Sequence, residues 1–310
     1  MLSRIVEIAD DHRHLSLFRG FMVVEDTQQE RGTPARELGR VPLDDIAAVI
    51  THANDITYTN NLLVALAQQG SPFVFCAANH NPVGVLWSVD GHSLQAKRFD
   101  AQITAGKPTH KRLWAALVKA KLQQQAAVLE VTGAPSIPLS ALAKTVRAGD
   151  PDNKEAQGAQ RYWPLLFGKT FRRNASAGGL NVLLNYGYTV QRAAMARAII
   201  AAGLHPTLGI FHRNEGNSMR LVDDLMEPFR PLVDFKVWQL WQNNPEPELT
   251  PEIKRTLVRV LYHDMGSGFG ATPVYIAMQR LATSLAQVYL KERDQLELPY
   301  PQLPMELMGE

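Results

Sequence analysis

The spacing of apolar residues changes once along this chain, close to residue 90, and the change restricts the folds open to it. Before that point, short apolar runs are separated by polar residues or by Gly, Pro and Asn, which is the pattern of short strands. From about residue 94 the apolar stripe has helical spacing, as in Leu113, Ala116, Leu117, Ala120, Lys121 and Val128. We predict an α+β protein, with an N-terminal β-rich domain followed by a larger all-α domain.

The expected elements divide the chain into a strand domain at residues 1–88, a linker at 89–96 and a helical domain at 97–310. Strands are expected at 5–8, 15–24, 46–50, 72–76 and 83–87. One helix interrupts them at 60–69, because Thr59 is a suitable N-cap and Gly70 a suitable C-terminal stop. Further helices are expected from 109 onward and near 139–148, 152–173, 179–202, 218–242, 251–265 and 273–294, before an irregular proline-rich tail.

The composition is that of a globular protein. Hydrophobic residues make up 45% of the 310, and the formal charge of +2 does not by itself indicate a polyanionic partner. Cys76 lies in an apolar run, either as a small packed side chain or, alternatively, as a reactive thiol. Acidic residues near the start argue against a secretory signal, and Arg197 interrupts the most apolar helical region. We therefore expect a cytoplasmic protein that does not use a membrane.

Glu155 is the first candidate for chemistry. Asp150 and Pro151 precede it as an expected N-cap and first helical residue, which places Glu155 in an early helical turn. Gly158 and Tyr162 share its helix face, so the carboxylate would have room beside it. The alternative is that this carboxylate serves only as a favourable partner of the helix dipole.

His212 and a group of acids are the next candidates. His212 ends an apolar segment and begins a polar loop, where it is either a presented ligand or an ordinary hydrogen-bonding side chain. Asp223, Asp224 and Glu227 recur at spacings that place like charges on one helix face. A bound cation would relieve their repulsion, and a solvated acidic face is the alternative. Pro228 is expected to kink or restart the helix beside Glu227.

Carboxylates with one imidazole suit Mg²⁺ or Mn²⁺ better than a structural zinc ion. Such an ion polarises a scissile phosphate and orients water or a 3′-hydroxyl for in-line attack, so no nucleophilic side chain is required. The sequence contains neither a nucleotide-binding glycine loop nor a convincing serine-hydrolase elbow. The residues therefore favour phosphodiester chemistry over nucleotide-driven or acyl-transfer reactions.

Basic residues that could contact phosphates gather in two places, and a solvated basic face is the alternative for each. The first group, at the start of the long helix, is Lys107, His110, Lys111 and Arg112. The second follows Glu155 on the same expected helix and consists of Lys169, Arg172 and Arg173. Arg161 lies nearer the proposed site. The candidate DNA-binding residues are Lys111, Arg112, Arg161, Lys169, Arg172 and Arg173.

Four segments together carry a family resemblance over nearly the whole chain, although any one of them would be weak. They are Asn153 to Ala156, Leu180 to Tyr188, Gly209 to His212 and Leu221 to Pro231. With them the chain resembles the universal CRISPR-associated integrases, the family Cas1. The last segment is most similar to members from systems with a single large effector nuclease, the type II-like group.

The resemblance implies a catalytic Mg²⁺ or Mn²⁺ held by Glu155, His212 and Glu227. It selects Glu227 over Asp224, a choice that the residues alone leave open, because relatives place Glu or Asp at that position. Asp224 would then lie just behind the ligands. Tyr188 would line the site, with simple helix packing as the alternative.

By the same resemblance the chain is a metal-dependent DNA endonuclease and integrase of CRISPR adaptation. A spacer DNA 3′-hydroxyl would attack a phosphodiester at the repeat edge by transesterification. The implied partners are double-stranded spacer-precursor and repeat DNA, the small subunit Cas2, and a second copy of the chain in a homodimer within a larger heteromeric complex. The rival hypotheses are a non-catalytic DNA-binding scaffold and a metal-dependent nuclease of unrelated biology.

Overall fold

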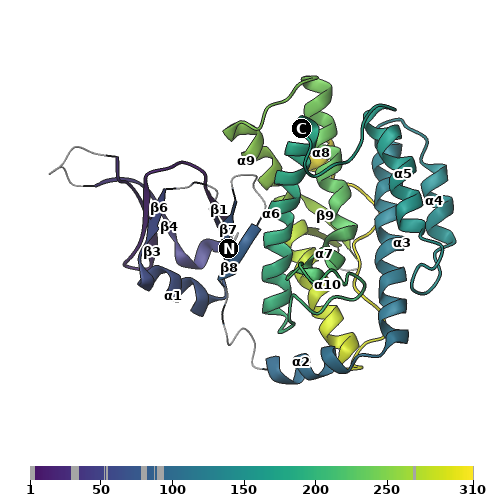
Figure 1. The fold of residues 1–310 in the computed structure, drawn as a ribbon, viewed down its shortest axis with the longest axis horizontal. Coiled ribbons are helices and arrows are strands. Elements are labelled where there is room, and N and C mark those ends of the chain that lie inside the picture. Colours follow the sequence, from purple (N-terminus) through teal and green to yellow (C-terminus); the bar gives the residue numbers. More distant parts are fainter. Residues whose placement is uncertain are drawn as a thin grey trace. The chain divides into compact units, whose positions relative to one another are not determined.

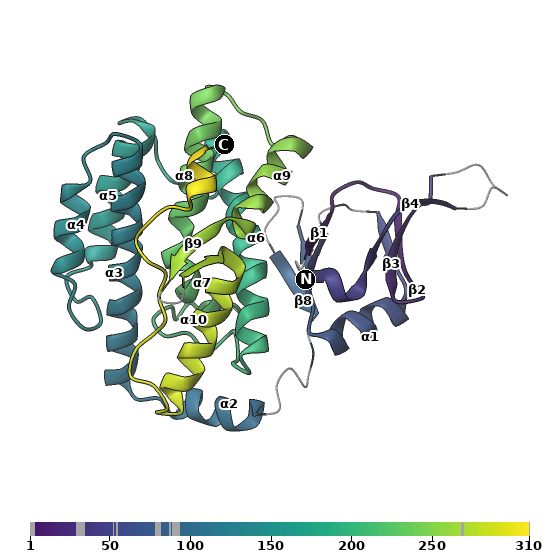
Figure 2. The ribbon, with the colours of Figure 1, turned by 180° about the vertical axis from the view of Figure 1, so that it is seen from behind.

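The computed structural model describes residues 4–28, 35–51, 53, 55–77, 82–86, 88, 94–267 and 270–309. The chain forms two compact units, Met1–Ser93 and Leu94–Glu310, called here the β unit and the helical unit (Figures 1 and 2). Strands dominate the first and helices the second, which confirms the α+β class. Residues 89–93 of the expected linker lie outside the described residues, and α2 (Gln95–Thr104) follows them.

One sheet of the β unit has the strand order β1-β5-β7-β8. Its centre is parallel, with β5 (Ile46–Thr51) between β1 (Arg4–Ile8) and β7 (Phe73–Cys76), and β8 (Pro82–Leu86) is antiparallel to β7. All four strands were expected from their apolar runs. Parallel strands buried on both faces carry continuous apolar sequence, and this makes them the easiest strands to predict.

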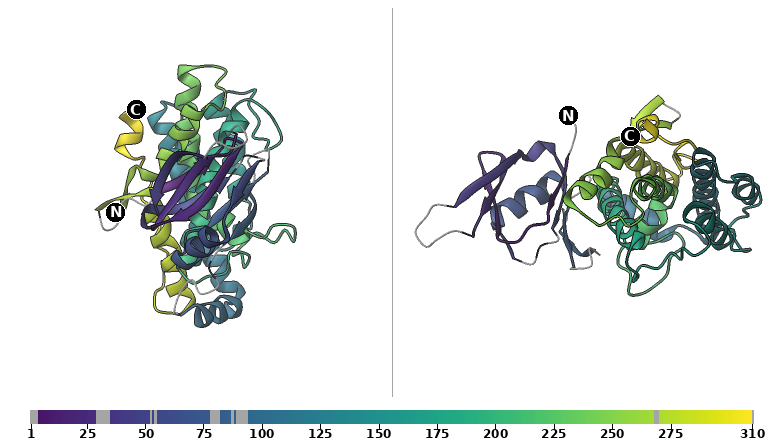
Figure 3. Two further views of the ribbon diagram at one scale, coloured as in Figure 1. Left: turned by 90° about the vertical axis from the view of Figure 1, so that its left-hand side faces the viewer. Right: turned by 90° about the horizontal axis from the view of Figure 1, so that it is seen from above.

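The other sheet has the order β4-β3-β2-β6, and its purple strands face the viewer in the left view of Figure 3. The single strand expected at 15–24 is wrong, because the segment folds into the hairpin of β2 (Arg13–Phe18) and β3 (Phe21–Asp26). Arg19 and Gly20 have φ angles of 49° and 81°, which is the backbone of a tight hairpin turn. The mostly exposed β4 (Arg36–Pro42) and the short β6 (Ile56–Tyr58) had no apolar pattern to predict them.

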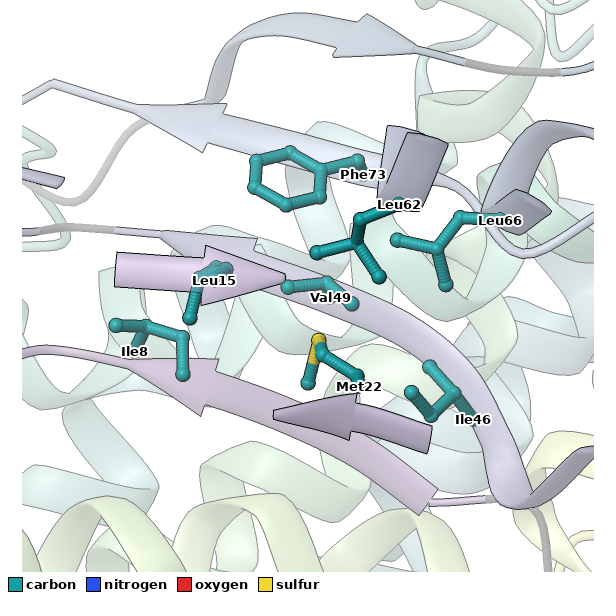
Figure 4. Packing of buried hydrophobic residues seen from close by; sticks show 8 residues of the cluster. All are labelled: Ile8, Leu15, Met22, Ile46, Val49, Leu62, Leu66 and Phe73. Carbon is teal, nitrogen blue, oxygen red and sulfur yellow. The ribbon is translucent and has the colours of Figure 1, made fainter. Parts of the chain in front are cut away.

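Both sheets and helix α1 (Asn60–Gln69) contribute to one core (Figure 4), which comprises Ile8, Leu15, Met22, Ile46, Val49, Leu62, Leu66 and Phe73. The predicted caps of α1 are confirmed, since the Thr59 side chain accepts a hydrogen bond from Leu62 N–H and Gly70 ends the helix with a φ of 74°. Burial raises the pKa of the Cys76 thiol to about 12, which favours a packed side chain over a reactive thiolate.

Two long helices organise the helical unit, and α7 and α8 lie between them in Figures 1 and 2. Helix α3 (Lys107–Val131) packs against α4 (Ile137–Lys144), α5 (Lys154–Phe167) and α8 (Arg230–Asn243). Helix α6 (Leu180–Ala201) packs against α7 (Arg220–Met226), α8, α9 (Pro251–Arg259) and α10 (Val274–Tyr289). The chain entering α8 is therefore held by both long helices. Among the described residues, no helix is both long and apolar enough to cross a membrane.

Some expected helices end earlier than predicted. The helix expected at 152–173 stops at Phe167, because Gly168 has a φ of 91°, so the basic residues after it lie in a loop. The helix expected at 218–242 is interrupted by the 3-10 turn η2 (Glu227–Phe229), where Pro228 restarts it as predicted.

The helical unit is also not entirely helical: β9 (Asp264–Ser267) and β10 (Gly270–Pro273) form a hairpin whose strands are too short to show an alternating pattern. The proline-rich tail carries the short helix α11 (Met305–Gly309).

Gly187 permits the close approach of α6 and α8. A Cβ atom at this position would lie 2.4 Å from Val233 Cγ1, and Val233 is fully buried and β-branched, so its side chain has no inexpensive alternative rotamer. We predict that Gly187→Ala lowers the free energy of unfolding by about 1–3 kcal/mol in chemical denaturation. Gly178→Ala is the control, because nothing lies within 4 Å of its added Cβ. Equal stabilities of the two variants would contradict the prediction.

Candidate metal centre

The start of α5 positions Glu155. Asn153, with a φ of 52°, is the N-cap and accepts from Ala156 N–H, so the expected N-cap at Asp150 is wrong by three residues. Asp150 nevertheless accepts from Lys154 N–H at 2.8 Å and from Glu155 N–H at 3.0 Å. The side chains of Asn153 and Asp150 thus accept from the backbone N–H groups of the first turn, which have no partner within the helix. Glu155 lies in that turn, as predicted, with 30% of its side chain exposed.

Glu155 and Glu227 converge on the ammonium group of Lys121. Lys121 Nζ lies 2.5 Å from Glu155 Oε1 and 2.5 Å from Glu227 Oε2. The three residues come from α5, η2 and α3, and Arg230 Nε lies 3.1 Å from the other oxygen of Glu227. Carboxylates from separate parts of the chain therefore meet around one cation.

Mutual attraction keeps these buried groups charged. Burial opposes the charge of Lys121, but Glu227 and Glu155 outweigh it and raise the pKa of the ammonium group. Burial likewise opposes the charge of Glu227, whereas Arg230 and Lys121 lower the pKa of its carboxyl group. Such an arrangement is balanced only as a set, because removing one partner leaves an uncompensated buried charge.

Lys121 is the important residue that sequence reasoning missed. Its helical spacing places it on the apolar stripe of α3, between Ala120 and Leu122, and its exposed fraction is only 8%. The available signal was the charge itself. A lysine on a buried face is rare unless a carboxylate faces it. The charge of Lys121 therefore indicates an acidic partner, which the sequence reasoning did not identify.

His212 is held by Asp224. The imidazole Nδ1 lies 2.6 Å from Asp224 Oδ1, and the other carboxylate oxygen accepts the backbone N–H groups of Ile210 and Phe211 at 2.6 and 3.0 Å. This hydrogen bond to Asp224 raises the pKa of His212 against the opposing effect of burial. A carboxylate at Nδ1 fixes the orientation of the ring and leaves Nε2 as the nitrogen for a ligand.

The acids near residue 225 do not form a solvated face, so that alternative is wrong. Asp224 is 0% exposed and Glu227 is 6% exposed. They also do not act as one cluster, because each has its own partners: Asp223 receives Arg192 Nε at 2.8 Å, Asp224 holds the His212 segment, and Glu227 faces Lys121. Repulsion between the acids is thus relieved by separate partners.

The residues present fit a divalent cation in their chemistry. Within the residues that the structure describes, no three His, Cys, Asp or Glu side chains are grouped closely enough to hold a metal ion. Glu155 and Glu227 nevertheless surround a cationic atom, and the buried Glu227 Oε2 accepts no well-directed hydrogen bond. Burial raises the pKa of the Glu227 carboxyl group, whereas Arg230, Lys121 and, least of these, His212 lower it. Two carboxylates and an imidazole suit a hard divalent ion, and Lys121 stands where that charge is needed.

Tyr188 belongs to a buried network behind this centre. Its hydroxyl group donates a hydrogen bond to Asp234, and the guanidinium carbon of Arg230 lies 4.9 Å from the centroid of its ring. Tyr188 is 8% exposed and Tyr162 is 0% exposed. Tyr162 therefore packs in the interior, and Tyr188 is linked to Glu227 through Arg230.

The basic candidates are not brought to one place. Lys169, Arg172 and Arg173 line a cavity of about 700 Å³ beside α5. Arg173 donates to Asn181 and Asn185 at 3.0 and 2.7 Å, so its charge is engaged within the fold. Three further candidates are exposed, at Lys111 and Arg112 on α3 and Arg161 on α5.

Comparison with known proteins identifies the family. Residues 7–248 match the family model described as CRISPR associated protein Cas1. The chain belongs to the Cas1 family. The family resemblance seen in the sequence is thereby confirmed.

Individual Cas1 relatives match along most of their length. The chain is 38% identical over 263 residues to the CRISPR-associated endonuclease Cas1 of Neisseria meningitidis serogroup C, covering 84% of this chain and 86% of that protein. It is 31% identical over 237 residues to a Cas1 of Thermus thermophilus, covering 71% of this chain and 70% of that protein.

Solved structures share the fold. A casposase bound to integration product superposes with a TM-score of 0.81 at 18% identity and covers 96% of this chain and 94% of that one. A Cas1 protein from Thermotoga maritima superposes with a TM-score of 0.72 at 14% identity and covers 93% of this chain and 97% of that one.

The Asp234 network makes stability depend on pH. Burial raises the pKa of Asp234 to about 7, against about 3.9 for an unfolded aspartate. The folded chain thus binds this proton more tightly, so the contribution to stability is full below about pH 4 and is lost as the pH rises to about 7. We predict that Asp234→Asn gains up to about 2 kcal/mol relative to wild type between about pH 5 and pH 8 in denaturation experiments.

The control is Asp152→Asn, since Asp152 is exposed and a hydrogen bond from Arg147 lowers the pKa of its carboxyl group. Its stability difference from wild type should be flat over this pH range. A difference for Asp234→Asn that does not change with pH would show that this residue does not take up a proton in the folded chain.

Proposed function

We propose that this Cas1 protein is a metal-dependent DNA endonuclease and integrase of CRISPR adaptation, joining spacer DNA 3′-hydroxyl ends into the repeat array by transesterification. The observation that carries the proposal is the convergence of Glu155 and Glu227 around one cation, beside the segment that holds His212. The Neisseria relative is described as a CRISPR-associated endonuclease, and the casposase is bound to an integration product. Both descriptions support reaction at phosphodiester bonds.

Glu155, His212 and Glu227 are proposed to hold one Mg²⁺ or Mn²⁺. The bound ion would polarise the scissile phosphate and stabilise charge on the leaving oxygen. Asp224 holds the His212 ring through Nδ1, which presents Nε2 as the ligand atom. Lys121 pairs with both carboxylates, so it would compete with the cation for them.

Residues behind the ligands are proposed to keep Glu227 in place. Arg230 pairs with Glu227 and lies over the ring of Tyr188, whose hydroxyl group is tied to Asp234. We therefore assign Tyr188 a supporting role through Arg230. Because water and a DNA hydroxyl group are interchangeable attackers at such a centre, the same residues would serve both hydrolysis and strand transfer.

The proposed partners are double-stranded DNA, Cas2 and a second copy of this chain. A solved Cas6-RT-Cas1–Cas2 complex shares the fold with a TM-score of 0.74 at 15% identity, and a Cas1–DNA complex shares it with a TM-score of 0.55 at 16% identity. We propose a homodimer within a heteromeric complex, with residues 1–88 making dimer and partner contacts, and a cytoplasmic location. The proposed DNA contacts are Lys111, Arg112, Arg161, Lys169, Arg172 and Arg173, of which Arg173 also donates to Asn181 and Asn185. We also place the chain in the single-effector, type II-like group, on the resemblance of the segment from Leu221 to Pro231.

Strand transfer tests the proposal directly. A short duplex with free 3′ ends is incubated with a supercoiled repeat-bearing plasmid, Cas2 and Mn²⁺ or Mg²⁺, and the joined product is quantified with and without chelator. We expect Glu155→Gln and His212→Ala each to lower joining at least about 100-fold, since even residues behind metal ligands cost 10- to 100-fold. Mn²⁺ binding, measured by equilibrium dialysis, should weaken in both variants.

The control for this experiment is Asp152→Asn, which alters an exposed carboxylate just before α5 and should retain both joining and Mn²⁺ binding. If the Glu155 and His212 variants join DNA at the wild-type rate, or if chelator has no effect, the proposed metal centre is wrong. If the wild-type chain joins no DNA with Cas2 and either ion present, the chain is a DNA-binding scaffold. Hydrolysis without joining would instead indicate a nuclease of other biology.

A further inference from the structure

A basic cavity opens beside His212 that the proposed metal centre does not use. It has a volume of about 400 Å³, and its lining comes from the start of α3, the loop before α5 and the segment around His212. The lining residues are Lys107, His110, Lys111, Trp114, Gly149, Ile210, Phe211 and Arg213. None of these lining residues is acidic, so the cavity is suited to an anion.

Phe211 forms an aromatic wall of this cavity. Its ring stacks on Trp114 with 4.2 Å between the centroids and 1° between the planes. Trp114 is 2% exposed, whereas Phe211 is 47% exposed, so a buried ring holds an accessible one flat. A rigid exposed aromatic face is the surface on which single-stranded nucleic acid bases stack, whatever their identity.

The cationic groups are placed to meet a phosphate. In the described part of the chain, Lys107, Lys111 and Arg213 have no carboxylate partner. Lys111 is also fixed at its base, because its carbonyl oxygen accepts Gly149 N–H at 2.7 Å and a Cβ on Gly149 would lie 2.9 Å from Lys111 Cγ. With a φ of 81°, position 149 suits glycine on both grounds.

We propose that this cavity, called the Phe211 pocket, binds one nucleotide of the DNA strand next to the reacting bond. The base stacks on the exposed face of Phe211, and its phosphate lies against Lys107, Lys111 and Arg213. The proposal rests on the proposed function, because it assigns the pocket to the same DNA substrate. The volume suits such a ligand, since small-molecule sites are typically about 300–1,000 Å³.

The Phe211 pocket would set the register of the strand. The rings of Trp114 and Phe211 each lie 5.8 Å from the His212 ring, edge to face. A base stacked on Phe211 is therefore held one residue away from a proposed metal ligand. The pocket would fix where along the strand the chemistry occurs without reading the base sequence, because stacking tolerates every base.

A fluorescent base analogue tests this assignment in the full-length chain. A partial duplex with a single-stranded 3′ overhang carries 2-aminopurine at each overhang position in turn, and fluorescence is recorded in chelator. We expect quenching at one position with wild type and none at that position with Phe211→Ala. Affinity should fall about 5- to 150-fold in this variant, the range for one base stack. An abasic nucleotide at that position should weaken wild type equally and leave the variant unchanged.

Matched variants separate stacking from charge and from damage to the fold. Ile137→Ala removes an apolar side chain that is 80% exposed on α4 and should leave quenching intact. Phe211→Leu keeps an apolar contact with Trp114 but removes the aromatic face, so quenching should be lost at an unchanged melting temperature. Lys111→Gln should keep the quenching but reduce the slope of log affinity against log salt by about 0.7–0.9, whereas Arg255→Gln, on exposed α9, should not change it.

The outcomes distinguish this proposal from the proposed function. Unchanged quenching in Phe211→Ala and Phe211→Leu, or no quenched position in wild type, overturns the Phe211 pocket. The fluorescence assay contains no divalent ion, so it does not depend on the proposed metal centre. A wild-type chain that quenches normally there, but joins no DNA in the separate strand-transfer assay, would refute the integrase and leave the Phe211 pocket supported.

Discussion

The helical unit depends on how it accommodates the positive charge of Lys121 in its interior. An ammonium group taken out of water is costly unless carboxylates compensate it, and the two that do so belong to α5 and to the turn before α8. Three parts of the chain are consequently locked together by charge as well as by apolar contact. The proposed catalytic carboxylates are thus also structural groups, so side chains that serve chemistry are held rigidly by the fold.

A buried carboxylate also holds the segment that contains His212. This stretch has no helix or strand of its own, and Asp224 of α7 replaces the missing regular structure by accepting its backbone N–H groups and its imidazole. Glu227, three residues later, turns toward α3 instead. Two neighbouring acids therefore perform unlike tasks, and the helix interruption at η2 allows them to point to different partners.

The sequence predicted those parts of the fold that local chemistry determines. Thr59 and Gly70 define α1 because a cap needs only its own helix, and Glu155 falls in a first turn for the same reason. The Arg19–Gly20 hairpin was missed because its strands are joined by a turn that lacks a typical glycine or asparagine pair. Lys121 was missed because its meaning lies in partners 34 residues away and further along the chain. The shared role proposed for Glu155 and Glu227 became predictable only through family resemblance, since spacing cannot show which distant helices meet.

The ammonium group between the carboxylates also bears on when the chain can fold. In a small zinc domain the ligands repel one another without the ion, so the metal-free chain is unfolded and binding energy becomes folding energy. Here Lys121 already balances the charges of Glu155 and Glu227, so the helical unit needs no divalent ion to offset their repulsion. A divalent ion bound at Glu155 and Glu227, as we propose, would have to replace an attraction that already exists, and this would lower its affinity for the two carboxylates.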